Sequence, residues 1–191
     1  MAMPRSWSNP LRSLSRAACL AVLVAVPLDA SASLSAQPGA QVAFTASGPG
    51  GLKIVGTTSE LTALDDGQTV TVTVTLTHLS TGIDLRDRHM RDKYLETPTY
   101  PTAVLTVPRA SLALPTPGAT QAADLQGTVT IHGQTRPSTF HYAATSANGA
   151  YRVDAKLRVN MRDFGIVVPS YMGVTVKPDV DIDVHFAAAD H

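Results

Sequence analysis

Residues 69–79 read Thr-Val-Thr-Val-Thr-Val-Thr-Leu-Thr-His-Leu, and polar and apolar side chains alternate strictly up to Thr77. In an extended chain, successive side chains point to opposite faces, so this alternation places one kind of residue on each face. Valine and threonine are also β-branched and favour strands. The same period of two returns in residues 151–160 and 179–186. The pattern predicts half-buried β-strands with one apolar face and one solvated face.

Turn-forming residues divide the remaining chain at intervals of about ten to fifteen residues, the spacing typical of antiparallel sheets. Examples are Gly133 and the Asn148-Gly149 pair, which tolerate the positive φ of tight hairpins. Eight strands are expected in all, over residues 41–46, 52–61, 69–79, 102–107, 124–132, 136–145, 151–159 and 179–186.

Residues 83–95 interrupt this pattern. Their apolar positions, among them Leu85, Met90 and Tyr94, no longer alternate, which predicts a short helical insertion. Eight antiparallel strands with one such insertion favour a closed barrel, because closure removes exposed sheet edges. The fold class is therefore expected to be all-β, with a two-sheet sandwich as the alternative.

The first 32 residues have the pattern of a secretory signal peptide. Arg5, Arg12 and Arg16 precede an apolar run over residues 17–28, and small residues follow up to Ala32. The run is shorter than the roughly 20 residues that span a bilayer, and no second run follows. We expect a signal peptide over 1–32, a flexible segment over 33–40, one domain over 41–187, and an exported product, periplasmic or secreted.

The charge of the chain is balanced, with 15 basic and 15 acidic residues. Without residues 1–32, 12 basic and 14 acidic residues remain, and neither sign forms a long run. Nucleic acid is therefore not an expected partner. The only cysteine, Cys19, lies inside the predicted signal peptide. The exported domain must then be stabilised by burial of apolar side chains rather than by disulfides.

Three ordered motifs resemble the YceI-like family of polyisoprenoid- or lipid-binding proteins. The first is Arg-Asp-Arg-His-Met-Arg over 86–91, with Tyr94-Leu95 and Tyr100-Pro101 after it. The second is Gly-Thr-Val-Thr-Ile-His-Gly-Gln-Thr-Arg-Pro over 127–137, and the third is Asn-Met-Arg-Asp-Phe-Gly-Ile over 160–166. The resemblance implies an extended eight-stranded antiparallel barrel, similar to a lipocalin, that holds a long isoprenoid chain.

The expected interior is suited to such a ligand. Its side chains are mostly medium-sized and uncharged, and burial contributes about 0.8 kcal/mol per methylene against an association cost of roughly 4–15 kcal/mol. Because each methylene contributes little, only a long aliphatic chain buries enough of them to exceed the cost of association. The candidate ligand-binding residues are Val70, Val72, Val74, Leu76, Met90, Tyr94, Val129, Ile131, Val153, Leu157, Val159, Phe164, Ile182 and Val184. A plain packed core is the alternative.

Four polar residues of the insertion, Arg86, Asp87, His89 and Arg91, form a second candidate site. Guanidinium groups pair with carboxylate or phosphate, so the cluster suits a ligand headgroup at the barrel mouth. The competing interpretation, which we favour, is structural: such a cluster pairs internally and holds the helical segment in place.

Signatures of common enzymes are missing. The sequence has no Gly-x-Ser-x-Gly elbow and no His-Glu-x-x-His helix. Asp179, Asp181 and Asp183 mimic the start of a calcium loop, but its glycine and final glutamate are absent, so they are interpreted as the wet face of a strand. No metal, cofactor or catalytic residue is predicted.

Two hypotheses for function follow. The first is a non-catalytic carrier that holds a long apolar molecule, such as an isoprenoid quinone or a polyprenyl lipid, inside the barrel. The second is an exported interaction or stress-response module with a solid barrel, which binds a protein or glycan through loops such as residues 170–173. An unrecognised hydrolase is a weaker third reading. The oligomeric state, monomer or dimer, is left open.

Overall fold

The computed structural model describes residues 34–190, so the signal peptide predicted for 1–32 lies outside the described residues. The elements are, in chain order, β1 (Leu34–Ala36), β2 (Gln41–Ser47), η1 (Pro49–Gly51), β3 (Lys53–Thr58), β4 (Leu61–Asp65), β5 (Thr69–Thr75), α1 (Asp84–Arg88), η2 (His89–Tyr94), β6 (Thr102–Pro108), η3 (Arg109–Ser111), β7 (Thr120–Ile131), β8 (Gln134–Ala147), β9 (Ala150–Asn160), η4 (Met161–Phe164), β10 (Ser170–Tyr171), β11 (Val174–Thr175) and β12 (Asp179–Asp190).

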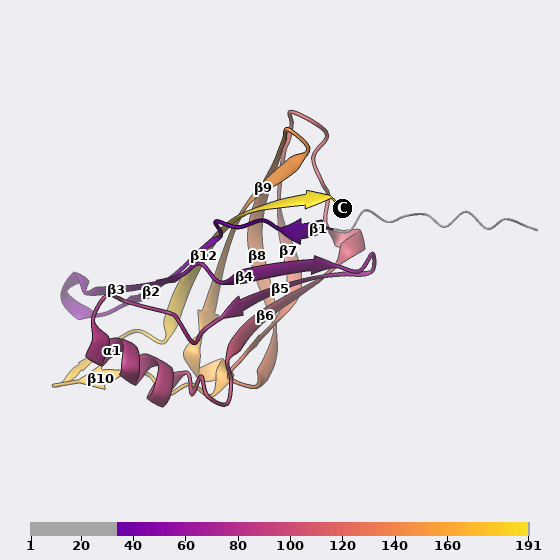
Figure 1. Ribbon diagram of the computed structural model, residues 1–191. Helices are drawn as coiled ribbons and strands as arrows, with labels where there is room; N and C mark the ends of the chain where they lie inside the picture. Colours follow the sequence, from indigo (N-terminus) through magenta and orange to yellow (C-terminus); the bar gives the residue numbers. More distant parts are fainter. Residues whose placement is uncertain (1–33, 191) are drawn as a thin grey trace, which may run out of the picture. The chain divides into compact units, whose positions relative to one another are not determined.

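Eight strands close into an antiparallel barrel (Figure 1). Their order around the barrel is β1, β4, β5, β6, β7, β8, β9 and β12, and β12 pairs in turn with β1. The predicted all-β class, the eight-stranded antiparallel barrel and the helical insertion are thereby confirmed. The alternative of a two-sheet sandwich is wrong. The two sheets of a sandwich have open edges, whereas in this sheet the last strand pairs with the first.

The last strand, β12, closes the barrel with two successive partners. Residues 180–185 pair with β2, while residues 188–190 pair with β1. Its other edge pairs with β9 over eleven residues. Because β2 and β3 form a hairpin that continues beyond β1, they extend the wall of the barrel at one end.

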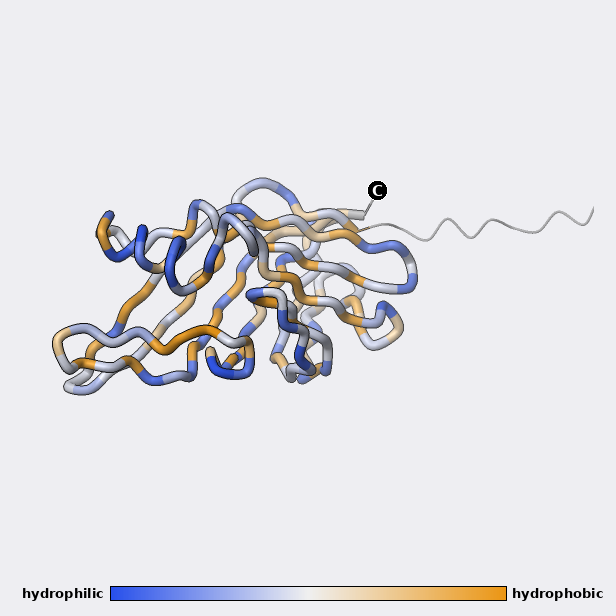
Figure 2. The backbone as a smooth tube through the Cα atoms, turned by 90° about the horizontal axis from the view of Figure 1, so that it is seen from below, coloured by the Kyte–Doolittle hydropathy of each residue, from blue (hydrophilic) through white to orange (hydrophobic). Residues whose placement is uncertain are grey.

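Alternation within the strands matches the pattern in the sequence. On β9, Leu157 is half-buried and faces the core, while Arg158 is exposed. Outward side chains form cross-strand ion pairs with β12, among them Arg158 to Asp181 at 2.6 Å and Lys156 to Asp183 at 3.5 Å. Figure 2 shows the apolar stretches along the strands and the most hydrophilic stretches at turns.

Two predicted strands have different bounds. The strand expected over 52–61 is divided into β3 and β4, because β3 pairs with β2 whereas β4 pairs with β5 and with β1. The strand expected over 69–79 ends at Thr75. Beyond it, the Leu76 amide donates to the Pro101 carbonyl and the Leu79 amide to the Leu76 carbonyl, so the chain turns away towards the insertion.

The flexible segment predicted for residues 33–40 is wrong over β1. Leu34 is buried, and β1 pairs with both β12 and β4. Polar residues surround this short apolar stretch, so its pattern alone does not predict a strand. The gap between the β4 edge and the end of β12 supplies the backbone partners that order it.

One glycine marks the closest approach of two strands. A Cβ atom on Gly127 of β7 would lie 2.7 Å from the Thr106 carbonyl oxygen of β6. This neighbour is backbone, which cannot rotate away. Gly127→Ala is therefore expected to lower the free energy of unfolding by about 1–3 kcal/mol, the usual cost of overpacking.

Chemical denaturation measures this change. Thr128→Ala, at the exposed neighbouring position, is the matched control and is expected to leave stability within about 0.5 kcal/mol of the wild type. Equal effects of the two substitutions would contradict the close approach.

Candidate functional site

The inward face of the barrel is apolar around its middle. One series of cross-strand neighbours connects five strands through Leu125, Phe140, Leu157, Ile182 and Phe44. None of these side chains carries a charge or a hydrogen-bonding group. This surface therefore attracts aliphatic or aromatic groups and offers nothing to a polar molecule.

Several of these inward side chains retain accessible surface. Val72, Leu157 and Ile182 are only half-buried, although each lies between two paired strands. A solid core packed at normal protein density buries such mid-strand side chains completely. Within residues 34–190, no large side chain is fully buried. Because these three residues pack against a core cluster and neighbouring strands cover both flanks, we infer that their accessible surface faces the barrel interior.

The predicted lining residues are buried or half-buried, and most of them belong to, or pack against, one of two core clusters. Val184 belongs to one core cluster, and the partly buried residues that pack against this cluster include Val72, Val74, Val153, Leu157 and Ile182. The other cluster contains Val129, Ile131, Val159 and Phe164, and Tyr94 packs against it. Val70 and Leu76 are buried as well, and Met90 is half-buried on η2. Their contact with a ligand stays a prediction.

Other inward residues were not among the candidates. Phe44, Leu105, Leu125, Phe140 and Phe186 all belong to, or pack against, the two core clusters. The alternation of residues 136–145 carried the signal for Phe140, since Phe140, Tyr142 and Ala144 share one face of β8. Leu125 shares one face of β7 with Val129 and Ile131, so the alternation of that strand carried its signal. Leu105 lies between Val104 and Thr106, and its strand pairing shows which way it faces.

The segment over residues 109–119 is held against one end of the barrel, at the right of Figure 1. Leu112 from this segment packs on the core cluster that contains Tyr142. The Tyr142 hydroxyl, although buried, donates to the Ala113 carbonyl at 2.9 Å and lies 3.2 Å from the Ala113 amide, which donates to it. These contacts cover the apolar interior at this end.

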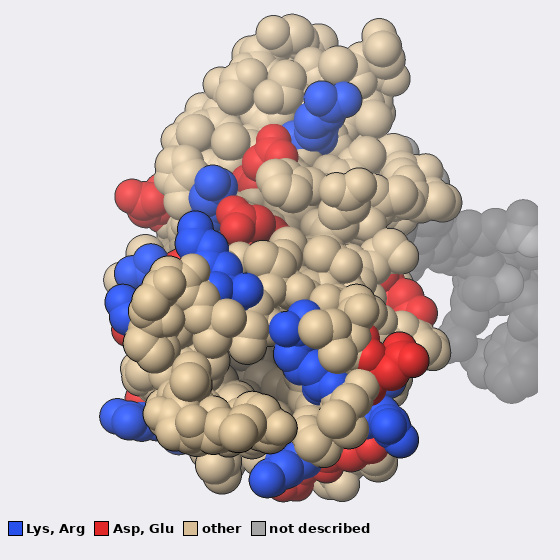
Figure 3. Space-filling model, turned by 90° about the vertical axis from the view of Figure 1, so that its left-hand side faces the viewer, with Lys and Arg blue, Asp and Glu red and all other residues tan. Residues whose placement is uncertain are grey.

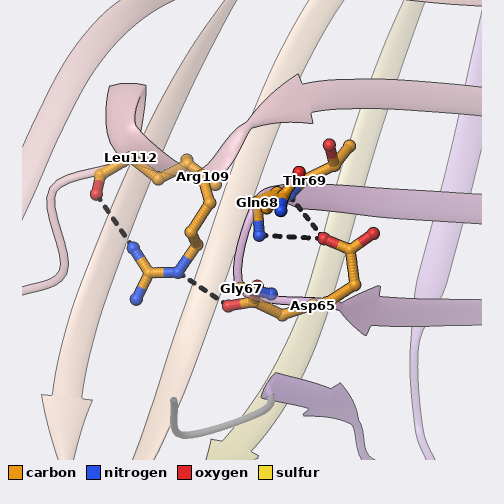
Figure 4. A network of polar contacts seen from close by, with 7 residues as sticks. Asp65, Gly67, Gln68, Thr69, Arg109 and Leu112 are labelled. Atoms are coloured by element: carbon orange, nitrogen blue, oxygen red, sulfur yellow. Dashed lines mark hydrogen bonds and ion pairs between the residues drawn. The ribbon is translucent and has the colours of Figure 1, made fainter. Parts of the chain in front are cut away.

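A buried ion pair anchors the same segment (Figure 4). The Arg109 Nε donates to Asp65 Oδ2 at 2.7 Å, and the Gly67 amide donates to Asp65 Oδ1 at 2.9 Å. The Asp65 side chain is fully buried, while that of Arg109 is 28% exposed. A buried carboxylate is tolerated only with such partners. The pair therefore links the β4–β5 turn to the loop that covers this end.

The opposite end carries the helical insertion, the β2–β3 hairpin and the β10–β11 hairpin, all at the left of Figure 1. Figure 3 looks onto this end and shows that it is hollowed, with Lys and Arg side chains beside the hollow. Tyr94 and Leu95 of the insertion pack against the second core cluster. The insertion thus packs on the apolar core at this hollowed end.

The polar residues of the insertion bind the chain that leads into it. Asp87 is 4% exposed and accepts from the Ser80 hydroxyl at 2.6 Å, from the Thr81 amide at 2.7 Å and from the Thr81 hydroxyl. Arg86 donates through Nε to the Thr81 hydroxyl at 2.6 Å and through Nη2 to its carbonyl at 2.9 Å.

The other two members of the cluster contribute less. Arg91 lies 3.4 Å from the Thr77 carbonyl oxygen, and His89 is exposed. The hydrogen bonds of Arg86, Asp87 and Arg91 therefore serve the base of the insertion, in agreement with the structural interpretation. The headgroup role of the cluster stays a prediction.

These contacts change the acidity of Asp87. Burial by itself raises the pKa of its carboxyl group, but the hydrogen bonds from Ser80 and Thr81 and the charge of Arg91 outweigh burial and lower that pKa below its ordinary value of 3.8. The carboxylate form is therefore the one that holds the insertion.

Comparison with known proteins supplies the family. A model of the YceI-like domain matches residues 35–188, which is most of the chain. The chain belongs to the YceI-like family. Comparison with curated protein sequences found no match.

Solved structures share the YceI-like fold. A polyisoprenoid binding domain from Saccharophagus degradans, described as implicated in plant cell wall breakdown, has a TM-score of 0.67 and 19% identity, covering 84% of this chain and 99% of that one. BcnA from Burkholderia cenocepacia has a TM-score of 0.60 and 16% identity, covering 76% and 95%. At these identities the likeness shows the fold alone.

The three YceI-like motifs meet at one place in this structure. His132, at the tip of the β7–β8 hairpin, lies 4.6 Å from Tyr100 between ring centroids, and its Nδ1 is 3.2 Å from the Phe164 carbonyl oxygen. A Cβ on Gly133 would lie 2.7 Å from the Tyr100 ring. The motifs thus join the insertion, one hairpin and η4 near the entrance. The arrangement is a packing junction of three distant segments.

The outer wall offers little chemistry. A groove of about 660 Å³ on it is lined mainly by polar residues, among them Gln41, Thr57, Glu60, His78 and His185. Exposed histidines pair there with carboxylates, as His78 does with Glu60 at 2.6 Å. Over residues 34–190, no three His, Cys, Asp or Glu side chains gather to hold a metal ion, and no helix is long and apolar enough to cross a membrane.

The Asp65 to Arg109 ion pair yields a first prediction for this region. Arg109→Met is expected to lower the free energy of unfolding by about 3–5 kcal/mol, because it removes the countercharge of a buried carboxylate. Denaturant titration measures the loss. The double variant Asp65→Asn/Arg109→Met is expected to recover part of it, and a double variant no more stable than Arg109→Met would contradict the pairing.

The lowered pKa of Asp87 yields a second prediction. Because folding favours its carboxylate form, Asp87 contributes stability that is complete above the unfolded pKa and is lost as pH falls through the folded value. Asp87→Asn is therefore expected to cost about 1–3 kcal/mol at pH 7, and less as the pH falls below 3.8. Unfolding measured from pH 7 to pH 3 tests this, with Asp92→Asn, at an exposed position on η2, as control. A pH-independent difference would contradict it.

Proposed function

We propose that the protein is an exported, non-catalytic carrier that holds one long apolar molecule inside its barrel. The observation that carries the proposal is that Val72, Leu157 and Ile182 pack against the core of a closed barrel and yet are only half-buried. Unfilled apolar surface of this kind is stabilised when a hydrocarbon chain displaces water from it. A barrel of eight strands is just wide enough for one slender ligand.

The shape of the interior favours a chain rather than a compact ligand. The longest strand, β8, has 14 residues, which correspond to about 45 Å at the usual rise per residue. A strand tilt of about 40° in a barrel of this size leaves roughly 35 Å along the axis. An isoprenoid quinone, a polyprenyl lipid or another long lipid has the matching dimensions and polarity.

The polarity of the two ends gives the ligand a direction. Asp65 and Arg109 neutralise each other at the covered end. The opposite end is hollowed and has Lys and Arg side chains beside it (Figure 3). The apolar tail therefore lies towards the covered end, and the polar head remains at the entrance.

Two further observations support the proposal. The Saccharophagus degradans domain of the same fold is described as polyisoprenoid binding, and this chain covers 99% of it. Residues 1–32 have the pattern of a signal peptide, which supports export of the product, either to the periplasm or by secretion. The competing hypothesis of a solid interaction module stays a prediction, and the half-buried inward side chains count against it.

Native mass spectrometry of the protein, purified from an exporting host without detergent, tests the proposal directly. The expected result is a complex with one species of several hundred daltons, which organic extraction then identifies as an isoprenoid or fatty chain. An unliganded mass that does not change after incubation with a quinone or a polyprenol would overturn the carrier function. The mass of the protein itself also shows whether residues 1–32 have been removed.

A pair of neighbouring substitutions on β5 tests the location of the ligand. Val72 faces the interior, whereas Thr71 faces outward, and both are half-buried. Val72→Trp is expected to weaken binding of a fluorescent long-chain probe at least tenfold, because the indole fills the space of the ligand. Thr71→Trp, the matched control, is expected to leave binding unchanged. Equal binding by both variants would place the ligand outside the barrel.

A further inference from the structure

Exposed apolar side chains gather at the hollowed end of the barrel. Among the described residues, nine large hydrophobic side chains are exposed, and Leu64 on β4 is the one that lies on the barrel wall. The other eight belong to the β2–β3 hairpin, to α1 and its approach, and to the β10–β11 arm: Leu52, Val55, Ile83, Leu85, Val167, Tyr171, Met172 and Val174. Single exposed hydrophobic residues are ordinary, but a group confined to one end marks an interaction surface.

The tip of the β10–β11 hairpin is the most exposed part of this group. Tyr171 is 78% exposed and Met172 is 86% exposed. The hairpin is well defined, since Tyr171 pairs with Val174 and the Thr175 hydroxyl donates to Ser170 Oγ at 2.9 Å. At its base, the Val176 amide donates to the Pro169 carbonyl, and the Val176 side chain is buried. The hairpin thus holds two exposed apolar side chains at its tip.

The conformation of the turn shows that folding does not require a methionine there. Met172 has a φ of +49° and Gly173 a φ of +80°, as in a two-residue hairpin turn that favours Asn-Gly. A methionine in this region is strained, and its side chain makes almost no contact with the protein. Methionine at this position is therefore unfavourable for the turn and for solubility. We infer that its side chain contacts a binding partner.

The form of the surface favours a lipid bilayer over a protein groove. The tip is convex and narrow, and the remaining apolar side chains are spread over three separate elements at this end. A tyrosine beside an aliphatic side chain suits the boundary between headgroups and acyl chains. Residues 164–178 contain Lys177 and no acidic residue, so the arm does not repel an anionic surface.

We propose that the hollowed end docks on a lipid bilayer with Tyr171 and Met172 inserted at its interface, so that an apolar ligand passes between membrane and barrel without crossing water. This inference rests on the proposed carrier function, because it supplies the membrane from which the ligand is taken or to which it is delivered. Basic and acidic residues both occur on the insertion, so apolar contact is expected to contribute more than charge.

Vesicle flotation tests the docking. The probes are vesicles of phosphatidylcholine alone and of phosphatidylcholine with phosphatidylglycerol, mixed with the protein purified from an exporting host. The wild type is expected to float, more completely with phosphatidylglycerol. Tyr171→Ser/Met172→Asn is expected to reduce the floated fraction at least fivefold, and asparagine at position 172 preserves the turn. Leu64→Ser, which removes a 62% exposed leucine from the wall, is the matched control and is expected to float like the wild type.

The insertion itself has an optical signature. The only tryptophan of the chain, Trp7, lies within the predicted signal peptide, so Met172→Trp adds a single probe to the exported protein. Its emission is expected to shift to shorter wavelength with vesicles and to be quenched by brominated acyl chains. Absence of flotation by the wild type, or equal flotation of the hairpin variant, would overturn the proposal. A second outcome would also overturn it. If the wild type is a dimer that does not float and the hairpin variant is a monomer, the tip binds a second copy of the chain.

Binding of a long-chain probe delivered from solvent separates the two proposals. Tyr171→Ser/Met172→Asn is expected to bind this probe as the wild type does, since neither residue lines the interior. If the wild type binds the probe but does not float, the carrier function is supported and the docking is contradicted. If the wild type floats, the hairpin variant does not, and neither binds the probe, the docking is supported and the carrier function is contradicted.

Discussion

Pairing of β12 with β1, which closes the sheet into a barrel, is the constraint on which the rest of the structure depends. Residues 188–190 hold β1, residues 180–185 hold β2, and the opposite edge holds β9. Without this pairing the sheet has two open edges and no enclosed interior. With it, every inward side chain faces other inward side chains, so the apolar surface is sheltered from water except at the hollowed end.

The sequence predicts the strands well wherever a strand has one wet and one dry face. The alternation in residues 69–79 and 151–160 identifies β5 and β9, because the period of two is a direct consequence of burial on one side. It does not identify β1, which has three residues and is ordered by pairing with β12 and β4. It also does not separate β3 from β4, because the bend between them follows from a change of partner strand.

The candidate site follows the same logic. Val72, Leu157 and Val184 were predictable as inward residues, since each belongs to a clear alternating run. Leu105 follows another apolar residue, Val104, so its orientation depends on the pairing of β6 with β5 rather than on a local pattern. The roles of Asp65 and Arg109 were not predictable, because 44 residues separate them and only the closed fold places them at the same end. The three motifs that resemble the YceI-like family lie far apart in the sequence. In the structure they meet through Tyr100, His132 and Phe164.

The covered end has a consequence for the rate at which the interior exchanges its contents. Tyr142 and Arg109 fix the 109–119 segment, so in the proposed carrier a molecule in the barrel would leave by the way it entered. Each methylene that is withdrawn loses its apolar contacts before the next one moves, so the barrier to exit grows with the buried length. A barrel sealed at one end therefore retains long chains for longer times than short ones, even where both enter equally fast.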